Sequence, residues 1–142
     1  VLSVFGGKIT TYRRLAEEAL HRLAHYFPGL RPAWTSGTAL PGSDFGAQSR
    51  AEARDAFFSR HPAIPTPTLR AIFRRHGTQA DKVVADGKLG EEYGAGLTER
   101  EVAYFTEHEW ARSAEDVLWR RTKCGLLMSE AQRRRVQQVM GR

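Results

Sequence analysis

Residues 12–24 read YRRLAEEALHRLA, and this stretch decides the fold class. Its apolar side chains recur at steps of three and four residues, which is the spacing of one face of an α-helix. They are Tyr12, Leu15, Ala16, Ala19, Leu20, Leu23 and Ala24. Either Thr10 or Thr11 can cap the start of this helix, and Pro28-Gly29 ends it. The pattern therefore predicts an amphipathic helix.

The residues before this helix predict a short strand. Val1–Phe5 is rich in β-branched and aromatic side chains, and Gly6-Gly7 follows it. Without the neighbouring strands of a sheet, we expect such a strand to be disordered or to pair with another copy of the chain.

The rest of the chain carries repeated signals for helix starts and ends. A start is indicated by Ser or Thr followed three residues later by an acidic or amide side chain, or by Pro in the first turn. These pairs are Thr66 with Pro67, Thr78 with Asp81, Thr98 with Glu101, Ser113 with Asp116, and Ser129 with Gln132. We predict a mainly α fold, an array of about six to seven helices with a short N-terminal strand.

A stretch rich in Pro and Gly, residues 28–46, separates the opening segment from the remainder. We therefore predict three parts. Residues 1–27 are the strand-helix remnant of another domain, residues 28–46 are a linker, and residues 47–142 are a helical accessory domain.

Composition excludes several classes of protein without naming a function. The chain has 142 residues, with 22 Lys and Arg against 16 Asp and Glu, so that its net charge is +6. It has no apolar run near the ~20 residues of a membrane-spanning helix. Its single cysteine, Cys124, excludes an intramolecular disulfide and a multi-cysteine zinc site.

A glycine turn joins the predicted strand to the first helix, in residues 5–13, FGGKITTYR. Glycines permit positive φ and let a ligand approach the backbone, while the start of the helix suits an anion. The turn is not a P-loop, because Leu2 replaces its first Gly and Ile9 its Ser or Thr. The third glycine of the dinucleotide fingerprint is also missing. By these residues alone, an anion site and a plain strand-helix corner with an exposed Lys8 are equally good interpretations.

The same nine residues resemble the last flavin-domain segment of the FAD-dependent glycerol-3-phosphate dehydrogenases, the aerobic, respiratory enzymes that reduce quinone. Further blocks of the chain continue this resemblance. They are residues 15–17 (LAE), 32–35 (PAWT), 40–42 (LPG), 107–110 (EHEW) and 116–123 (DVLWRRTK). Because these blocks span nearly the whole chain, it resembles the C-terminal part of that family.

The resemblance implies a parent enzyme that oxidises sn-glycerol 3-phosphate to dihydroxyacetone phosphate and passes electrons through FAD to quinone. Its nucleotide-binding Rossmann unit would lie upstream of Val1, and residues 1–27 would be the end of its FAD and substrate domain. The rest of that enzyme would be the partner of this chain. We expect the parent to be cytoplasmic and peripheral to the bacterial inner membrane, and the isolated chain to bind no FAD and to be inactive.

Site residues are also implied by the resemblance. The cofactor-binding residues would be Gly6, Gly7, Lys8, Ile9, Thr10 and Thr11. The backbone of residues 7–10 would face the pyrimidine edge of the flavin, where reduced flavin holds negative charge that a helix start stabilises. Lys8 would be the catalytic residue, supporting substrate or flavin electrostatically. Thr11 would either cap the helix or position the residues that contact the flavin.

Two other classes of function remain open from the sequence. The first is an independent basic helical module that binds an acidic partner or an anionic membrane surface, supported by the net charge and by the arginines at 120–121 and 133–135. The second is nucleic-acid binding, which we do not expect because no recognition motif accompanies the charge. The block Trp119–Lys123 could bind a phosphate, a lipid head group or an acidic partner. Alternatively its helix could be structural, with Leu118 and Trp119 packed inward and the arginines paired with acids.

A metal site is a weak alternative in the first helix. Glu17, His21 and His25 share one helical face, and His at positions i and i+4 can bind zinc. The Glu of the metalloprotease motif is missing after the first His, so we expect no metal.

Overall fold

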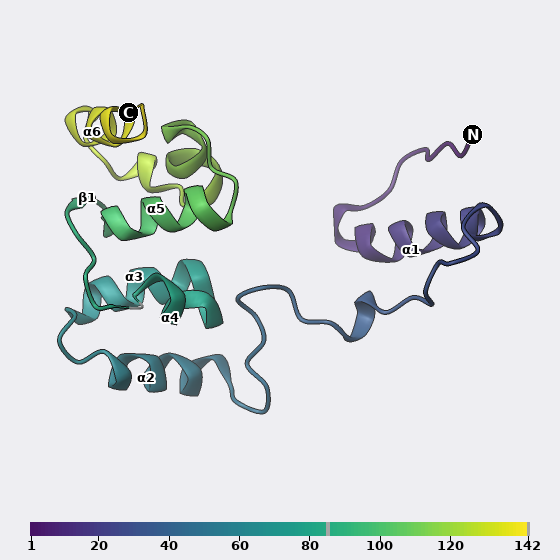
Figure 1. Cartoon of the computed structure of the whole chain (residues 1–142), viewed down its shortest axis with the longest axis horizontal. Coiled ribbons are helices and arrows are strands. Elements are labelled where there is room, and N and C mark those ends of the chain that lie inside the picture. Colours follow the sequence, from purple (N-terminus) through teal and green to yellow (C-terminus); the bar gives the residue numbers. More distant parts are fainter. Residues whose placement is uncertain (85, 142) are drawn as a thin grey trace. The chain divides into compact units, whose positions relative to one another are not determined.

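The computed structural model describes residues 1–84 and 86–141 (Figure 1). The chain forms two compact units, Val1–Ala39 (unit 1) and Leu40–Arg142 (unit 2). The boundary between them lies within the Pro- and Gly-rich residues 28–46. The mainly α fold that the sequence predicts is confirmed.

Unit 1 is built on one helix, α1 (Tyr12–Leu23), which is purple in Figure 1. The short 3-10 helices η1 (Ile9–Thr11) and η2 (Ala24–Tyr26) flank it, and η3 (Thr35–Gly37) follows. Two ion pairs one turn apart support α1, Arg13 with Glu17 at 2.9 Å and Glu18 with Arg22 at 3.0 Å. No residue of α1 is buried, so that its apolar face is not covered within the described chain.

Two predictions for the start of the chain are wrong. Val1–Phe5 is irregular rather than a strand, because a strand needs a neighbour to pair with and the described part of unit 1 offers none. Neither Thr10 nor Thr11 caps a helix with its side chain. The Thr11 hydroxyl donates instead to the carbonyl oxygen of Lys8 at 3.0 Å.

Unit 2 holds the other helices and a small antiparallel sheet. The α-helices are α2 (Arg50–Arg60), α3 (Thr66–His76), α4 (Ala80–Val83), α5 (Glu99–His108) and α6 (Glu130–Met140). The shorter elements are η4 (Gly77–Gln79), β1 (Glu92–Gly94), β2 (Leu97–Thr98), the π-helical η5 (Asp116–Arg121) and η6 (Cys124–Leu126). Figure 1 shows α2, α3 and α4, α5 and α6 following one another across this unit.

Local capping explains where several of these helices begin. Ser129 and Gln132 form the predicted reciprocal capping box of α6, and Thr98 accepts from the N–H of Glu101 at the start of α5. A further capping box, between Ser49 and Glu52, starts α2 and was not predicted from the sequence.

The β1–β2 hairpin was not predicted from the sequence either. In it Glu92 pairs with Thr98 and Gly94 with Leu97. The turn residues Ala95 and Gly96 have φ of 52° and 68°, both positive as in the tight turns that join antiparallel strands.

Two apolar clusters form the core of unit 2. One gathers β1, β2, α5, η5 and α6 around Tyr93, Leu97, Val102, Phe105, Ala111, Ala114, Val117, Leu118, Cys124, Met128 and Val136. The other gathers α2, α3, α4 and one face of α5 around Ala53, Phe57, Ile64, Leu69, Ile72, Phe73, Ala80, Val83, Val84 and Tyr104. Helix α5 thus contributes to both clusters. Across residues 1–84 and 86–141, no helix is both long enough and apolar enough to cross a membrane.

Candidate functional site

The glycine turn of unit 1 presents bare backbone to its surroundings. Gly6 and Gly7 have φ of 76° and 127°, a region that favours glycine. All of residues 1–10 are exposed, and a Cβ added to Gly6 would meet no atom within 4 Å. A flat ligand could therefore approach the backbone at Gly6, whereas at Gly7 an added Cβ would lie 3.2 Å from Leu15 Cδ2.

Positive charge lies directly after the turn. Lys8 is extended, with φ of −89° and ψ of 136°, and forms no ion pair with the described residues. The first internal hydrogen bond of η1 runs from the Thr11 N–H to the carbonyl of Lys8 at 3.0 Å. The N–H groups of Ile9 and Thr10 precede that bond and, like those at any helix start, have no partner inside the helix. The turn thus combines open backbone, helix-start N–H groups and one unpaired ammonium.

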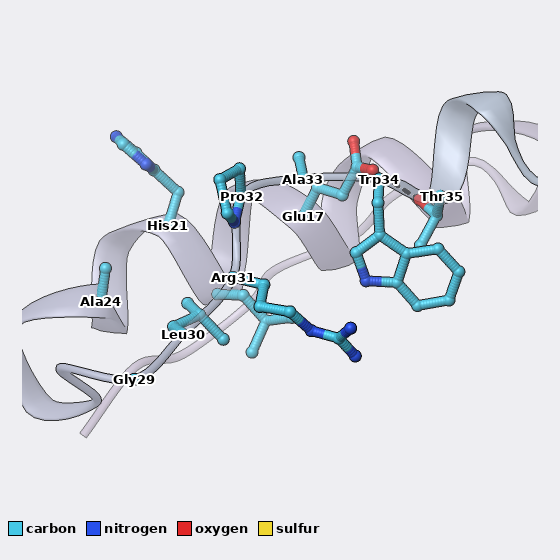
Figure 2. A pocket seen from close by; sticks show the side chains of 11 residues that line it. Glu17, His21, Ala24, Gly29, Leu30, Arg31, Pro32, Ala33, Trp34 and Thr35 are labelled. Carbon is cyan, nitrogen blue, oxygen red and sulfur yellow. Dashed lines mark hydrogen bonds between the residues drawn. The ribbon is translucent and has the colours of Figure 1, made fainter.

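A second hollow of unit 1, a pocket of about 490 Å³, lies between α1 and residues 29–35 (Figure 2). Glu17 accepts a hydrogen bond from the Thr35 hydroxyl at 2.5 Å and forms an ion pair with Arg13 at 2.9 Å. The hydrogen bond from Thr35 lowers the pKa of Glu17 most, and Arg13 acts in the same direction against the opposing effect of burial. Figure 2 shows Glu17 and Thr35 joined beside Trp34, with His21 at the far end.

This arrangement gives Glu17 a structural role. The carboxylate holds residue 35 against α1, and His25 packs on Tyr26 with ring centroids 3.8 Å apart. Within the described parts of the chain, no three His, Cys, Asp or Glu side chains are placed to hold a metal ion.

A buried ionic cluster lies in unit 2. Arg75 on α3 binds the carboxylate of Glu101 on α5 through two hydrogen bonds, Nε to Oε1 at 2.5 Å and Nη2 to Oε2 at 2.6 Å. His76 Nε2 lies 2.7 Å from the same Oε1. Burial raises the pKa of Glu101, but the hydrogen bonds from His76 and Arg75 outweigh it and the pKa lies below its ordinary value. Glu101 is therefore an ionised carboxylate that accepts from both neighbours.

Beside this cluster lies a cavity of about 620 Å³, which we call the α3–α5 cavity. It is lined by Pro41, Arg75, His76, Gln79, Lys82, Tyr104, His108, Glu109, Trp110 and Arg121. Trp110 is 81% exposed and has a φ of 58°, a left-handed conformation that is strained for a bulky residue. Such strain is concentrated at functional sites in proteins. These residues could not be grouped from the sequence, because they come from four separate segments of the chain.

The second block of the resemblance, Trp119–Lys123, is held by internal partners. Leu118 is buried and Trp119 packs against the core, as the structural interpretation requires. Arg120 pairs with Asp116 at 2.8 Å, and Arg121 donates to the carbonyl of Glu109 at 2.7 Å. This block is therefore committed to packing rather than free to grip a phosphate.

The arginine run 133–135 is also partnered. Arg133 donates to the carbonyls of Gly125 and Met128, at 3.0 and 2.7 Å. Arg134 pairs with Glu130, and Arg135 pairs with Glu91. Two of the three charges are matched by carboxylates, which weakens the case for a basic docking face.

Comparison with known proteins gives consistent matches. The family model for the C-terminal domain of alpha-glycerophosphate oxidase matches residues 33–142. A glycerol-3-phosphate dehydrogenase of Pseudomonas aeruginosa is 43% identical over 144 residues, covering 99% of this chain and 28% of the relative. The aerobic glycerol-3-phosphate dehydrogenase of Escherichia coli is 39% identical, covering 97% of this chain and 28% of the relative.

A third relative carries a different name. The D-erythritol 1-phosphate dehydrogenase of Brucella abortus is 39% identical over 137 residues, covering 94% of this chain and 27% of the relative. In each of the three comparisons, the chain spans no more than 28% of the length of the curated relative.

Proposed function

Because this chain belongs to the family of the C-terminal domain of alpha-glycerophosphate oxidase, we propose that it is the C-terminal part of an FAD-dependent glycerol-3-phosphate dehydrogenase. The enzyme oxidises glycerol 3-phosphate to dihydroxyacetone phosphate and delivers the electrons to quinone, as a cytoplasmic protein peripheral to the inner membrane. Two relatives that are 43% and 39% identical carry the name glycerol-3-phosphate dehydrogenase, which supports this substrate over D-erythritol 1-phosphate.

The observation that carries this proposal is the uncovered apolar surface of unit 1. Among its 39 residues, none is buried. Its exposed large apolar side chains are Val1, Leu2, Val4, Phe5, Ile9, Tyr12, Leu15, Leu20, Tyr26, Phe27, Leu30 and Trp34. A segment this short cannot bury a core of its own, since chains below about 40 residues need other stabilisation. Unit 1 therefore completes a larger domain, which we assign as the FAD and substrate domain.

The glycine turn fits a flavin by its own geometry. Gly6 and Gly7 carry no Cβ and tolerate the positive φ of this turn, and the space beside Gly6 is open. When bound, FAD supplies the acceptor for the electrons and hydride equivalent that leave the substrate. In this proposal the backbone of residues 7–10 lies along the ring, and the Thr11 hydroxyl stabilises the turn through its bond to Lys8.

Two kinds of group in this chain then stabilise negative charge in the active site: the N–H groups of a helix start and the ammonium of Lys8. The N–H groups at the start of η1 and α1, with the positive end of the helix dipole, stabilise negative charge close to them. Among the described residues Lys8 has no competing ion pair, so its ammonium is available to the phosphate or to the reacting oxygen of the substrate. Charge placed before the reaction begins needs no reorganisation during it, and for that reason such groups accelerate catalysis.

Unit 2 serves as an accessory domain in this proposal. Its core is complete within Leu40–Arg142, and its ionic groups are largely matched by one another. It acts as a scaffold or an interface within the enzyme and performs no chemistry on its own.

Two linked measurements test this function. The first follows flavin absorbance in the protein that contains this chain together with its FAD domain. We expect reduction by glycerol 3-phosphate, with a higher kcat/KM than for D-erythritol 1-phosphate. The second adds FAD to the isolated 142-residue chain, for which we expect no stoichiometric binding. Tight flavin binding by the isolated chain, or a larger enzyme without a flavin, would contradict the proposal.

A further inference from the structure

The glycine turn of unit 1 is supported from α1 by one apolar side chain. A Cβ added to Gly7 would lie 3.2 Å from Cδ2 of Leu15, and beyond the adjacent residues of the chain no other described atom comes within 4 Å of it. We propose that Leu15 is a positioning residue, which fixes the peptide group between Gly7 and Lys8 in the orientation that acts on a bound flavin. This inference rests on the function proposed above, because that function assigns the turn to the flavin.

The place of Leu15 in α1 directs its side chain to the turn. Helical side chains lean towards the N-terminus of their helix, so a leucine at the end of the first turn of α1 extends back over the helix start. Leu15 is 38% exposed, and no residue of α1 is buried. Its contact with Gly7 is therefore not a by-product of packing in a core.

Gly7 needs such a support because glycine has the least restricted backbone of all residues. Its φ is 127°, and a glycine takes positive and negative φ with similar ease. All of residues 1–10 are exposed, and the space beside Gly6 is open. Groups that act on a reaction must be held within about 0.5 Å of their productive place. A side chain packed on Gly7 restricts the turn before any flavin binds.

The next residue of the turn is held from the same helix start. The N–H and the hydroxyl of Thr11 both donate to the carbonyl oxygen of Lys8, each at 3.0 Å. The peptide group between Gly7 and Lys8 thus lies between two supports, an apolar contact before it and a pair of hydrogen bonds after it. Its N–H donates to no acceptor in the described chain and is open to a ligand. Loss of the apolar support should let this N–H turn away from the flavin.

Flavin reduction by glycerol 3-phosphate, in the enzyme that contains this chain and its FAD domain, tests the proposal. For Leu15→Ala we expect the rate of reduction per bound flavin to fall about tenfold, because a displaced group acts less well on the reaction. The midpoint potential of the bound flavin should become more negative, since an N–H that stabilises the charge of the reduced form is no longer held. Leu20→Ala is the matched control. It removes the same atoms from α1, at a residue that is 48% exposed and lines the pocket against residues 29–35, and should leave both values unchanged.

A second variant keeps the test decisive if Leu15→Ala weakens folding. Leu15→Val has no δ carbon to reach Gly7 but keeps a branched apolar side chain, and it should shift the rate and the potential in the same directions. Variants of Leu15 that merely lose flavin, with an unaltered rate and potential for the flavin that remains, would overturn the proposal. Equal changes in Leu20→Ala would overturn it as well. An unaltered enzyme whose bound flavin is not reduced by glycerol 3-phosphate would instead contradict the proposed function.

Discussion

Arg75 and Glu101 form a two-pronged ion pair inside unit 2, with N–O distances of 2.5 and 2.6 Å and side-chain exposures of 5% and 0%. The pair joins α3 to α5 across 26 residues of sequence. His76 adds a third hydrogen bond to the same carboxylate, and Arg75 also donates to the carbonyl of Gly96 at 2.6 Å. The helices α3 and α5 and the β1–β2 hairpin are thus held together by one buried ion pair.

Removing the carboxylate of Glu101 should lower the stability of the fold. We expect Glu101→Ala to lower the free energy of unfolding by about 3–5 kcal/mol, because Arg75 is left buried without its counter-ion. The exposed pair of Glu130 with Arg134 gives the control, and Glu130→Ala should cost less than about 1 kcal/mol. Urea unfolding followed by circular dichroism measures both. Equal losses for the two variants would contradict a structural role for the buried pair.

The same carboxylate predicts a loss of stability in acid. The lowered pKa of Glu101 means that its contribution is fully present above its ordinary value of 4.5 and is lost as pH falls through the lower folded value. The free energy of unfolding should therefore decrease as pH falls below about 4.5. Urea unfolding at a series of pH values should show a shallower decrease for Glu101→Gln. An identical slope in variant and parent would assign the acid sensitivity elsewhere.

Asp116 should titrate unusually low. Its carboxylate accepts from the Arg112 N–H at 2.9 Å and from the Ser113 side chain at 3.0 Å, which lowers its pKa from 3.8 to about 2. Its contribution to stability is present above pH 3.8 and is lost as pH falls towards 2. NMR of the carboxyl carbon follows the titration directly. Ser113→Ala should move the midpoint upward, and an unchanged midpoint would refute the role of this hydroxyl.

Gly77 should tolerate no side chain. Its φ is 54°, and an added Cβ would lie 1.8 Å from the carbonyl oxygen of Gly42. That carbonyl accepts from the Thr78 N–H at 3.1 Å, so relieving the clash would break a backbone bond as well. We expect Gly77→Ala to cost more than about 2 kcal/mol. Gly87, with a φ of 72° and open space around it, is the control for left-handed strain alone. Similar costs at the two positions would show that the close approach to Gly42 is unimportant.

Unit 1 should be far less stable than unit 2 in the isolated chain. Amide hydrogen exchange is expected to show almost no protection in α1, because none of its residues is buried. Helices α3 and α5, which contribute to the core clusters, should be protected. Protection of α1 equal to that of α5 would mean that unit 1 needs no covering domain.

The starts of α5 and α6 were predictable because their capping signals are local. Ser129 with Gln132 and Thr98 with Glu101 lie within one turn of chain, so the sequence contains both partners of each cap. The strand predicted at Val1–Phe5 failed for the opposite reason, since strand formation depends on a neighbour that the sequence pattern does not include.

The buried cluster of Arg75, His76 and Glu101 could not be predicted from local sequence patterns. Glu101 was assigned to a capping box with Thr98, but its side chain binds Arg75 and His76 instead. Nothing in the spacing of residues 26 positions apart indicates that contact, and the α3–α5 cavity depends on the same long-range packing. The glycine turn, by contrast, was predictable as a motif, because Gly6, Gly7 and Lys8 are consecutive.

The most direct test of the account is the rate of flavin reduction by glycerol 3-phosphate in the enzyme that contains this chain and its FAD domain. We predict that Lys8→Ala keeps the flavin bound but slows its reduction by at least about a hundredfold, as expected for loss of a charge that supports the transition state. The control Lys88→Ala should reduce its flavin at the unaltered rate. Flavin reduction in Lys8→Ala as fast as in the unaltered enzyme would contradict the assignment of the glycine turn to the active site.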